Sequence, residues 1–311
     1  MHRPNSKLKK ERHMKTQRYS IEQHKARWGW FFVLPSIGFF AVFSLYPMLN
    51  AFWNTFFNIK LLSLKTPEFV GLKNYIFVLS SPEFWESIKA TAIFTLLSFV
   101  PLTIFSLVFG LVITTRKRGK QLIQLLIYAP ALLSSVVAAL IWLLLFDPRG
   151  IANSFVNFVS NTPGIDHKWL ILPAKLYGAT AVIYFWKYIG YFTIIIATGI
   201  AKIPTSVMEA ATIDGASARQ TIGKIIMPLL RPTTMMVSIV AMLNCMKSFS
   251  TQYLFTQRGA PSAPLNVLTL NIYTTAMRDR NISRACVMSF ILFFVMMILT
   301  IVRMRASEEK N

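Results

Sequence analysis

The polar stretch SVMEAATIDGA at residues 206–216, followed by MPLLRP at 227–232, separates two long apolar segments of the chain. Ser206 and Ser217 each stand three residues before a Glu or a Gln, the spacing of a capping box that binds the free backbone amides of a helix start. Gly215 lies between them, where a chain that leaves a helix commonly takes a left-handed conformation. The stretch therefore predicts two short helices on a polar loop.

The composition indicates an all-α integral membrane protein. Of the 311 residues, 54% are hydrophobic and 14% are charged, and the mean hydropathy is +0.49. At ~1.5 Å per residue, six segments are long enough to cross a hydrocarbon core of ~30 Å. These predicted spans are residues 28–50, 90–115, 122–146, 176–200, 233–255 and 285–302.

The distribution of basic residues predicts which side of the membrane each loop faces. The net charge is +21, and 20 of the 33 Lys and Arg residues fall in four alternate segments. Those segments are residues 1–27, 116–120, 202–231 and 303–311. By the positive-inside rule we expect them, and both termini, to be cytoplasmic. A charge sorted by side in this way argues against a nucleic-acid partner.

We divide the chain into three parts on these grounds. Residues 1–27 form a basic cytoplasmic tail, residues 28–303 a transmembrane domain that includes the polar loop 202–232, and residues 304–311 a second tail. Catalytic and nucleotide-binding patterns are missing: the sequence contains no GxxxxGK[ST], HExxH or GxSxG. We therefore expect no enzyme activity, no metal and no bound cofactor, and any process that uses ATP has to draw its energy from another protein.

Three patterns resemble the permease subunits of bacterial ABC importers. The EAAxxDGA at 209–216, with xPxLxP downstream, is similar to their cytoplasmic coupling loop, and FVGLxNY at 69–75 to a signature of their carbohydrate branch. Residues 247–276 are similar to the fifth helix and outer loop of maltose and glycerol-phosphate type subunits. The resemblance covers roughly 28–303. Its departures are Ser250, Ala260 and Met277, where Asp, Gly and Phe are usual.

The resemblance implies a type I importer permease, the first of two paired subunits, that translocates sugars or polyols. Its partners would be a second homologous permease, an ABC ATPase dimer that binds the ATP, and an extracytoplasmic solute-binding protein. The residues of the coupling loop would be Glu209, Ala210, Ala211, Asp214, Gly215, Ala216 and Pro228. We expect Val207, Ala210 and Ala211 to form a face of small side chains that the ATPase approaches. For Glu209, the alternative is that it only caps the backbone amide of Ser206.

Two polar stripes in the predicted spans indicate a substrate passage. Both follow the i, i+3, i+4, i+7 spacing of one helical face. The stripes are Tyr184, Lys187, Tyr188 and Tyr191, and Asn244, Lys247, Ser248 and Thr251. Counted from the outer ends of their spans, Lys187 and Asn244 share a depth of ~16 Å, near the midplane. Because a lysine at that depth costs roughly 2.5–3.5 kcal/mol against lipid, we expect both stripes to face water or protein.

Hydroxyl, amide and ammonium groups bind sugar hydroxyls, and tyrosine rings stack on sugar rings, so the stripes fit a saccharide. The alternative is a tyrosine stripe that packs the bundle and a lysine that reaches an interface or pairs structurally within the protein. An ion-driven secondary transporter is a second alternative for the whole chain, but it would normally carry an acid within the membrane, and the six segments have none. A third alternative for the whole chain is a membrane enzyme or an assembly scaffold.

Overall fold

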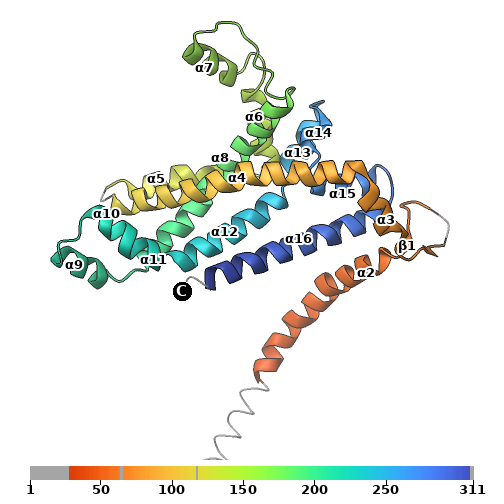
Figure 1. Cartoon of the computed structure of the whole chain (residues 1–311), viewed down its shortest axis with the longest axis horizontal. Coiled ribbons are helices and arrows are strands. Elements are labelled where there is room, and N and C mark those ends of the chain that lie inside the picture. The colour runs from red at the N-terminus through yellow and green to blue at the C-terminus, as the bar shows by residue number, and fades with distance from the viewer. Residues whose placement is uncertain (1–27, 64–65, 117, 309–311) are drawn as a thin grey trace, which may run out of the picture.

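The computed structural model describes residues 28–63, 66–116 and 118–308, so the predicted tail 1–27 lies outside the described residues. The described chain is built almost entirely of helices around a bundle (Figure 1). The helices that lie in the six predicted spans are α2 (Tyr46–Asn54), α4 (Pro82–Thr115), α5 (Lys120–Tyr128), α6 (Ser135–Leu145), α8 (Pro173–Ala201), α12 (Arg231–Met246), α13 (Ser250–Gln257) and α16 (Ile282–Glu308). The connecting helices are α3 (Lys73–Ser80), α7 (Ile151–Ser160), α9 (Thr205–Ile213), α10 (Ala218–Gln220), α11 (Met227–Leu229), α14 (Ser262–Leu265) and α15 (Leu268–Met277).

Four of the predicted spans are continuous helices, and two are bent. Trp28–Asn54, Pro82–Thr115, Pro173–Ala201 and Ile282–Ala306 are each long and apolar enough to cross a membrane. The third predicted span is instead made of Lys120–Leu132 and Ser135–Leu145, whose axes differ by 98°. Ser134 ends this bend, because its hydroxyl accepts a hydrogen bond of 3.2 Å from Val137 N at the start of α6.

The fifth span is broken as well, so the continuous helix predicted over 233–255 is wrong. Helix α12 ends at Met246 and α13 begins at Ser250. Between them Lys247 (φ −93°, ψ 7°) and Phe249 (φ −143°, ψ −52°) leave the helical conformation. The hydroxyl of Thr269 donates a 2.5 Å hydrogen bond to the carbonyl of Ser248, which the break leaves without a helical partner. A side chain from α15 thus stabilises the break.

The FVGLxNY segment forms a latch at the opposite end of the bundle from α9. Strands β1 (Phe57–Asn58) and β2 (Glu68–Phe69) pair antiparallel. The Asn74 amide donates 2.8 Å hydrogen bonds to the carbonyls of Thr55 and Phe57. The hydroxyl of Tyr75 also donates to Thr55 Oγ1, at 3.0 Å. The polar residues of this segment therefore anchor the connection between the first helix and α3.

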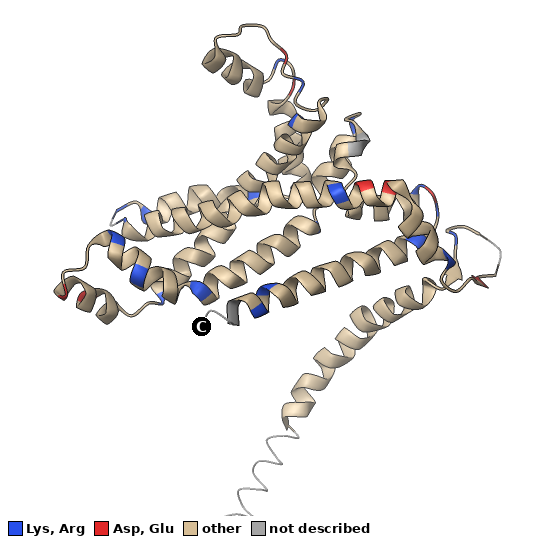
Figure 2. Ribbon diagram, in the orientation of Figure 1, with Lys and Arg blue, Asp and Glu red and all other residues tan. Residues whose placement is uncertain are grey.

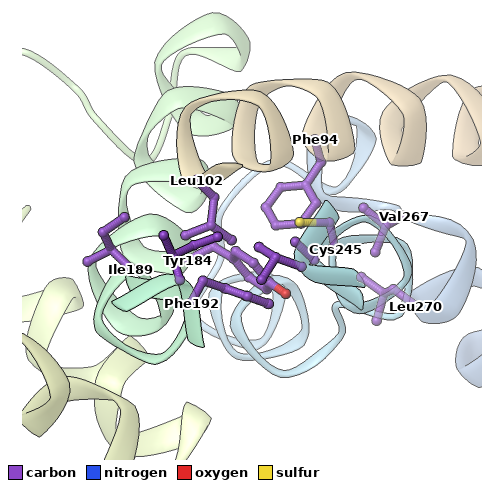
Figure 3. Packing of buried hydrophobic residues seen from close by; sticks show 11 residues of the cluster. Phe94, Leu102, Tyr184, Ile189, Phe192, Cys245, Val267 and Leu270 are labelled. Atoms are coloured by element: carbon purple, nitrogen blue, oxygen red, sulfur yellow. The ribbon is translucent and has the colours of Figure 1, made fainter. Parts of the chain in front are cut away.

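The main core lies where α4, α8 and α12 meet (Figure 3). Phe94 and Leu102 of α4 pack there against Phe192 of α8 and Cys245 of α12. The contact between α8 and α5 is closest at Gly190, where an added Cβ would overlap the carbonyl of Ile127. Helix Trp28–Asn54, in contrast, has no buried residue in its most apolar window and leaves the bundle at an angle (Figure 1).

Candidate functional site

Helix α9 projects from one end of the bundle on a turn that needs glycine (Figure 1). The helix ends at Ile213, and Gly215 takes a φ of +70°, as predicted. The amide of Ala216 donates a 2.9 Å hydrogen bond to the carbonyl of Ala211, which closes the helix end. Ser217 then starts α10, where the predicted capping box with Gln220 is present. The loop is therefore a fixed pair of helices joined by a left-handed residue.

The predicted capping box at Ser206 is wrong. Helix α9 begins two residues earlier than predicted, at Thr205, and its N-cap is Pro204, with no side-chain cap bond. The φ of Pro204, −57°, is fixed by its ring and leads the chain directly into the helix. Glu209 is exposed, and no hydrogen bond to its side chain occurs within the described part of the chain. The capping role that was the alternative for Glu209 is thus removed.

The outward surface of α9 differs from the predicted one. Ala211 is buried and Val207 half-buried, so these two residues, one turn apart, face inward. Glu209, Ala210 and Asp214 are exposed, and Ile213 is 85% exposed. Ile213 was not predicted, although a large apolar residue between two polar ones in this loop was a signal. Figure 2 shows acidic residues on α9 and basic residues on the neighbouring helices. Pro228 is also exposed, in α11.

A cavity of about 270 Å³ lies between α6, α8 and the break that separates α12 from α13. It brings together seven of the eight residues of the two predicted stripes. The lining residues are Ser135, Ile183, Tyr184, Lys187, Tyr188, Asn244, Lys247, Ser248, Phe249, Ser250 and Thr251. The exception is Tyr191, which is 39% exposed and contacts the ring of Phe192. The two stripes that the sequence placed at the same depth therefore lie together around one cavity, with Tyr191 as the exception.

Lys187 is the most buried charge in this cavity. Its side chain is 6% exposed. The ammonium nitrogen donates a 2.5 Å hydrogen bond to Ser135 Oγ and lies 5.1 Å from the ring centre of Tyr188. Tyr188 in turn lies with its ring centre 4.6 Å from that of Tyr184. An ammonium group held by a hydroxyl and an aromatic face keeps further donor capacity for a ligand.

Two interrupted helices meet at the cavity. Irregular backbone at membrane depth is tolerated where it lies inside protein or lines a cavity, and transporters use such breaks to build binding sites. Here Ser135 is the first residue of α6 and Ser250 the first of α13, so the positive ends of two helix dipoles adjoin the lining. None of the described residues that line the cavity is acidic. Lysines and helix starts together give it a positive potential.

Four lining residues were missed by the sequence reading: Ser135, Ile183, Phe249 and Ser250. Ser135 lies in a serine pair that interrupts an apolar run, which was a usable signal; Phe249 and Ser250 became visible only with the break in the helix. Phe249 also belongs to an aromatic trio. Its ring stacks on Tyr253 with centroids 5.2 Å apart, and both rings contact Tyr273. Of the trio only Phe249 lines the cavity, where it adds to the rings of Tyr184 and Tyr188 as an aromatic wall.

Comparison with known proteins identifies the family. Residues 93–307, more than two thirds of the chain, match the family described as binding-protein-dependent transport system inner membrane component. The chain belongs to this family. It is therefore a membrane component of a transport system, and both the interrupted α12 and the projecting α9 lie within the matched residues.

Curated relatives of this permease belong to transport systems for sugars and for sn-glycerol-3-phosphate. The trehalose/maltose transport system permease MalF of Thermococcus litoralis is 28% identical, over 94% of this chain and 97% of the relative. The lactose transport system permease LacF of Rhizobium radiobacter is 26% identical, over 95% and 99% of the two chains. The sn-glycerol-3-phosphate permease UgpA of Brucella abortus is 27% identical, over 90% and 94%.

Solved structures show that the fold is that of an ABC importer permease. A bacterial ABC transporter for the acidic polysaccharide alginate aligns with a TM-score of 0.75, over 94% of this permease and 99% of the other chain, at 18% identity. The same importer in complex with its alginate-bound periplasmic protein aligns with a TM-score of 0.76, over 91% and 94%. These likenesses establish the fold of the permease.

Proposed function

We propose that this permease passes sugars through the cavity at the two helix breaks. The observation that carries the proposal is that Lys187, Asn244 and Lys247 line one cavity beside an aromatic wall. Ammonium and amide groups donate hydrogen bonds to sugar hydroxyls, and aromatic faces stack on sugar rings. The sugar substrates of the curated relatives support the same class. In this proposal the chain recognises the sugar and gates its passage, and it catalyses no covalent reaction.

The charge of the cavity favours a sugar that carries an anionic group. Two lysines line it and no acid does, so an uncompensated positive potential acts on any bound molecule. A carboxylate or phosphate on the sugar gains a charge-assisted hydrogen bond that a neutral sugar lacks. Lys247, which is exposed, is available for that contact. Glucuronate or a sugar phosphate is therefore a better fit than an unsubstituted hexose.

Energy is supplied, in this proposal, by a separate ATPase dimer that docks on α9. The exposed Glu209, Ala210 and Ile213 form a small surface that is acidic at Glu209 and apolar at Ala210 and Ile213. Gly215, Ala216 and Pro228 set the angles at which α9 and α11 present this surface. With α9 docked on an ATPase, the termini and the 202–232 loop are cytoplasmic, as the sorting of basic residues indicates.

A second permease and a binding protein complete the proposed importer. The first helix, Trp28–Asn54, presents apolar side chains on all sides, which suits lipid together with a neighbouring membrane subunit. The end of the bundle opposite α9, with α3 and the strands, is where an extracytoplasmic binding protein would deliver substrate (Figure 1). The family description, which names binding-protein-dependent transport, supports this partner.

Reconstitution with the neighbouring gene products tests the proposal. The expected result is uptake of a sugar into proteoliposomes that requires ATP, the binding protein and this chain together. Tyr188→Ala should reduce uptake, whereas Tyr191→Ala, the same change three residues away and outside the cavity, should leave it unchanged. Equal effects of both variants would show that the cavity is not the passage. Uptake by this chain alone under an ion gradient would favour a secondary transporter.

A further inference from the structure

A groove runs along the bundle where α12 packs against both α4 and α16. Much of it is an apolar cavity of about 350 Å³. Its lining includes Leu96 and Phe99 of α4, Met242 of α12, and Leu292, Val295 and Leu299 of α16. Leu96 is 62% exposed and Leu299 37% exposed, so the groove is open to the surroundings along its length. An apolar groove on a membrane-spanning bundle is accessible to acyl chains.

A second cavity, of about 300 Å³, lies at the end of the groove nearest α9 and differs in chemistry. Arg231 and Arg303 line it together with the hydroxyls of Thr103, Thr234 and Ser238. Among the described side chains, which end at Ala306, no acidic residue lines it. Figure 2 shows basic residues gathered where the start of α12 meets the end of α16, close to the C-terminus. This cavity is therefore suited to an anion.

The two cavities form one continuous surface. Each of the three helices lines both, at positions four residues apart, which is one helical turn of ~5.4 Å. The pairs, apolar cavity first, are Phe99 and Thr103 on α4, Met242 and Ser238 on α12, and Leu299 and Arg303 on α16. All three helices change from apolar to polar lining in the same direction. A molecule with an apolar chain and an anionic head matches this change.

Arg303 is already positioned as the main donor to such a head. Its Nε donates a 3.2 Å hydrogen bond to Ser238 Oγ, and that hydroxyl donates at 2.8 Å to the carbonyl of Met235. This contact fixes the guanidinium, and it is the only hydrogen bond of the Arg303 side chain within the described residues. The terminal amino groups of Arg303 keep N–H donors for a ligand. The threonine hydroxyls already donate to backbone carbonyls, so the Arg303 guanidinium is the main donor to the headgroup.

The groove has the length of one membrane leaflet. From Leu292 to Arg303, α16 rises by ~16 Å, about half of a ~30 Å hydrocarbon core. We propose that the groove binds one phospholipid with a net anionic headgroup. Its phosphate contacts Arg303 and Arg231, and an acyl chain lies along Leu299 and Val295 against α12. The proposal rests on the chemistry of these helices and does not depend on which substrate the permease carries.

Such a lipid acts close to the docking loop. Arg231 is the first residue of α12, and at this point helices Ala218–Leu229 and Arg231–Gln257 differ in direction by 65°. An anion held between Arg231 and Arg303 links the end of the α9–α11 loop to the end of α16. Binding of the lipid therefore favours one orientation of the loop, and the lipid composition of the leaflet would set how readily the loop moves.

Native mass spectrometry of the transporter complex that contains this chain tests the proposal. The complex is delipidated in mild detergent and titrated with phosphatidylglycerol or phosphatidylcholine. We expect phosphatidylglycerol to bind more tightly, and Arg303→Gln to weaken its binding by about tenfold, the scale of one charge-assisted hydrogen bond. Arg305→Gln removes the same charge from the same helix end outside the cavity and should change nothing. Leu299→Trp, which fills the apolar part, should also weaken binding.

Four results would overturn the proposal. Equal affinity for the two lipids, or an equal loss in Arg303→Gln and Arg305→Gln, would show that no specific anion site exists. Displacement of the lipid by inorganic phosphate alone would locate binding in the headgroup cavity and exclude the apolar groove. Lipid binding by this chain alone but not by the assembled complex would show that another subunit covers the groove.

Discussion

Lys187 on α8 and Ser135 on α6 are joined by a 2.5 Å hydrogen bond across the bend of the third span. The two residues are 52 positions apart, and both line the cavity of this permease. The bond ties the start of a broken helix to the most buried cation of the site. It therefore fixes the position of the Lys187 ammonium relative to the bend of the third span.

Replacing Ser135 by Ala should lower thermal stability, because the buried ammonium of Lys187 then loses a partner at a cost of roughly 1–3 kcal/mol. The measurement is thermal unfolding of the purified protein in detergent. A double-mutant cycle supplies the control. In a Lys187→Met background Ser135→Ala should have little further effect, since no ammonium remains. An equal loss in both backgrounds would show that the two residues do not interact.

Lys247→Met should discriminate between classes of sugar. Removal of one of two cavity cations lowers the affinity for an anionic sugar by about tenfold, as expected for a lost charge-assisted hydrogen bond, and changes a neutral sugar less. Competitive uptake of matched pairs, such as glucuronate against glucose, measures the difference. Arg258→Met, which removes a charge outside the cavity lining, is the control. A uniform loss for both sugars would contradict the electrostatic role of Lys247.

Gly215→Val should uncouple transport. At φ +70° a β-branched side chain costs about 1–2 kcal/mol, so the turn relaxes and α9 is misplaced. ATPase crosslinking and uptake should both fall while the amount of permease in the membrane is unchanged. Gly215→Asn is the graded control, because Asn tolerates the left-handed region and should retain most activity. Normal uptake in the valine variant would refute the importance of this turn.

Cysteine labelling tests the sidedness of the bundle. In a background without Cys245 and Cys286, a cysteine at Ser217 should react with an impermeant reagent only from the cytoplasmic side. One at Ser160, exposed at the end of α7, should react only from outside. The background protein is the blank. Reversed labelling would place α9 on the wrong side of the membrane for an ATPase.

Gly190→Ala should destabilise the bundle. The added Cβ would meet the carbonyl of Ile127 and the Cα of Tyr128, and neither backbone atom can move without shifting α5. Overpacking of this kind typically costs 1–3 kcal/mol, or roughly 2 kcal/mol here. Gly178→Ala, on the same helix with no atom within 4 Å of the added Cβ, is the control. Equal stability of the two variants would contradict the close contact of α5 and α8.

Much of this architecture was predictable because membrane spans follow simple rules of length and polarity. The four continuous helices agree with apolar runs that the sequence displays directly. Gly215 and the Ser217 box were predictable for the same reason, since capping is a local property of a few residues. The family resemblance rested on such local motifs and was confirmed over residues 93–307.

The breaks in the helices were not predictable, because they depend on contacts between distant segments. The interruption after Met246 is stabilised by Thr269, which lies more than 20 residues away along the chain. The predicted helical stripe over Lys247 to Thr251 therefore named residues that do line the cavity. The continuous helix on which that prediction relied is, however, broken at this point. Tyr191 shows the converse: it has the right spacing on an unbroken helix, yet it lies outside the cavity. The start of α9 at Thr205 was missed because a proline cap was overlooked.

ATP hydrolysis by the reconstituted complex is the most direct test of the proposed importer. With this chain, its companion permease, the ATPase and the binding protein in proteoliposomes, hydrolysis should rise when the sugar-loaded binding protein is added. The rise should disappear when this chain is omitted or carries Gly215→Val, although ATPase dimers remain present. Stimulation that persists without this chain, or that is unchanged in the Gly215→Val complex, would contradict a permease that couples transport to ATP through α9.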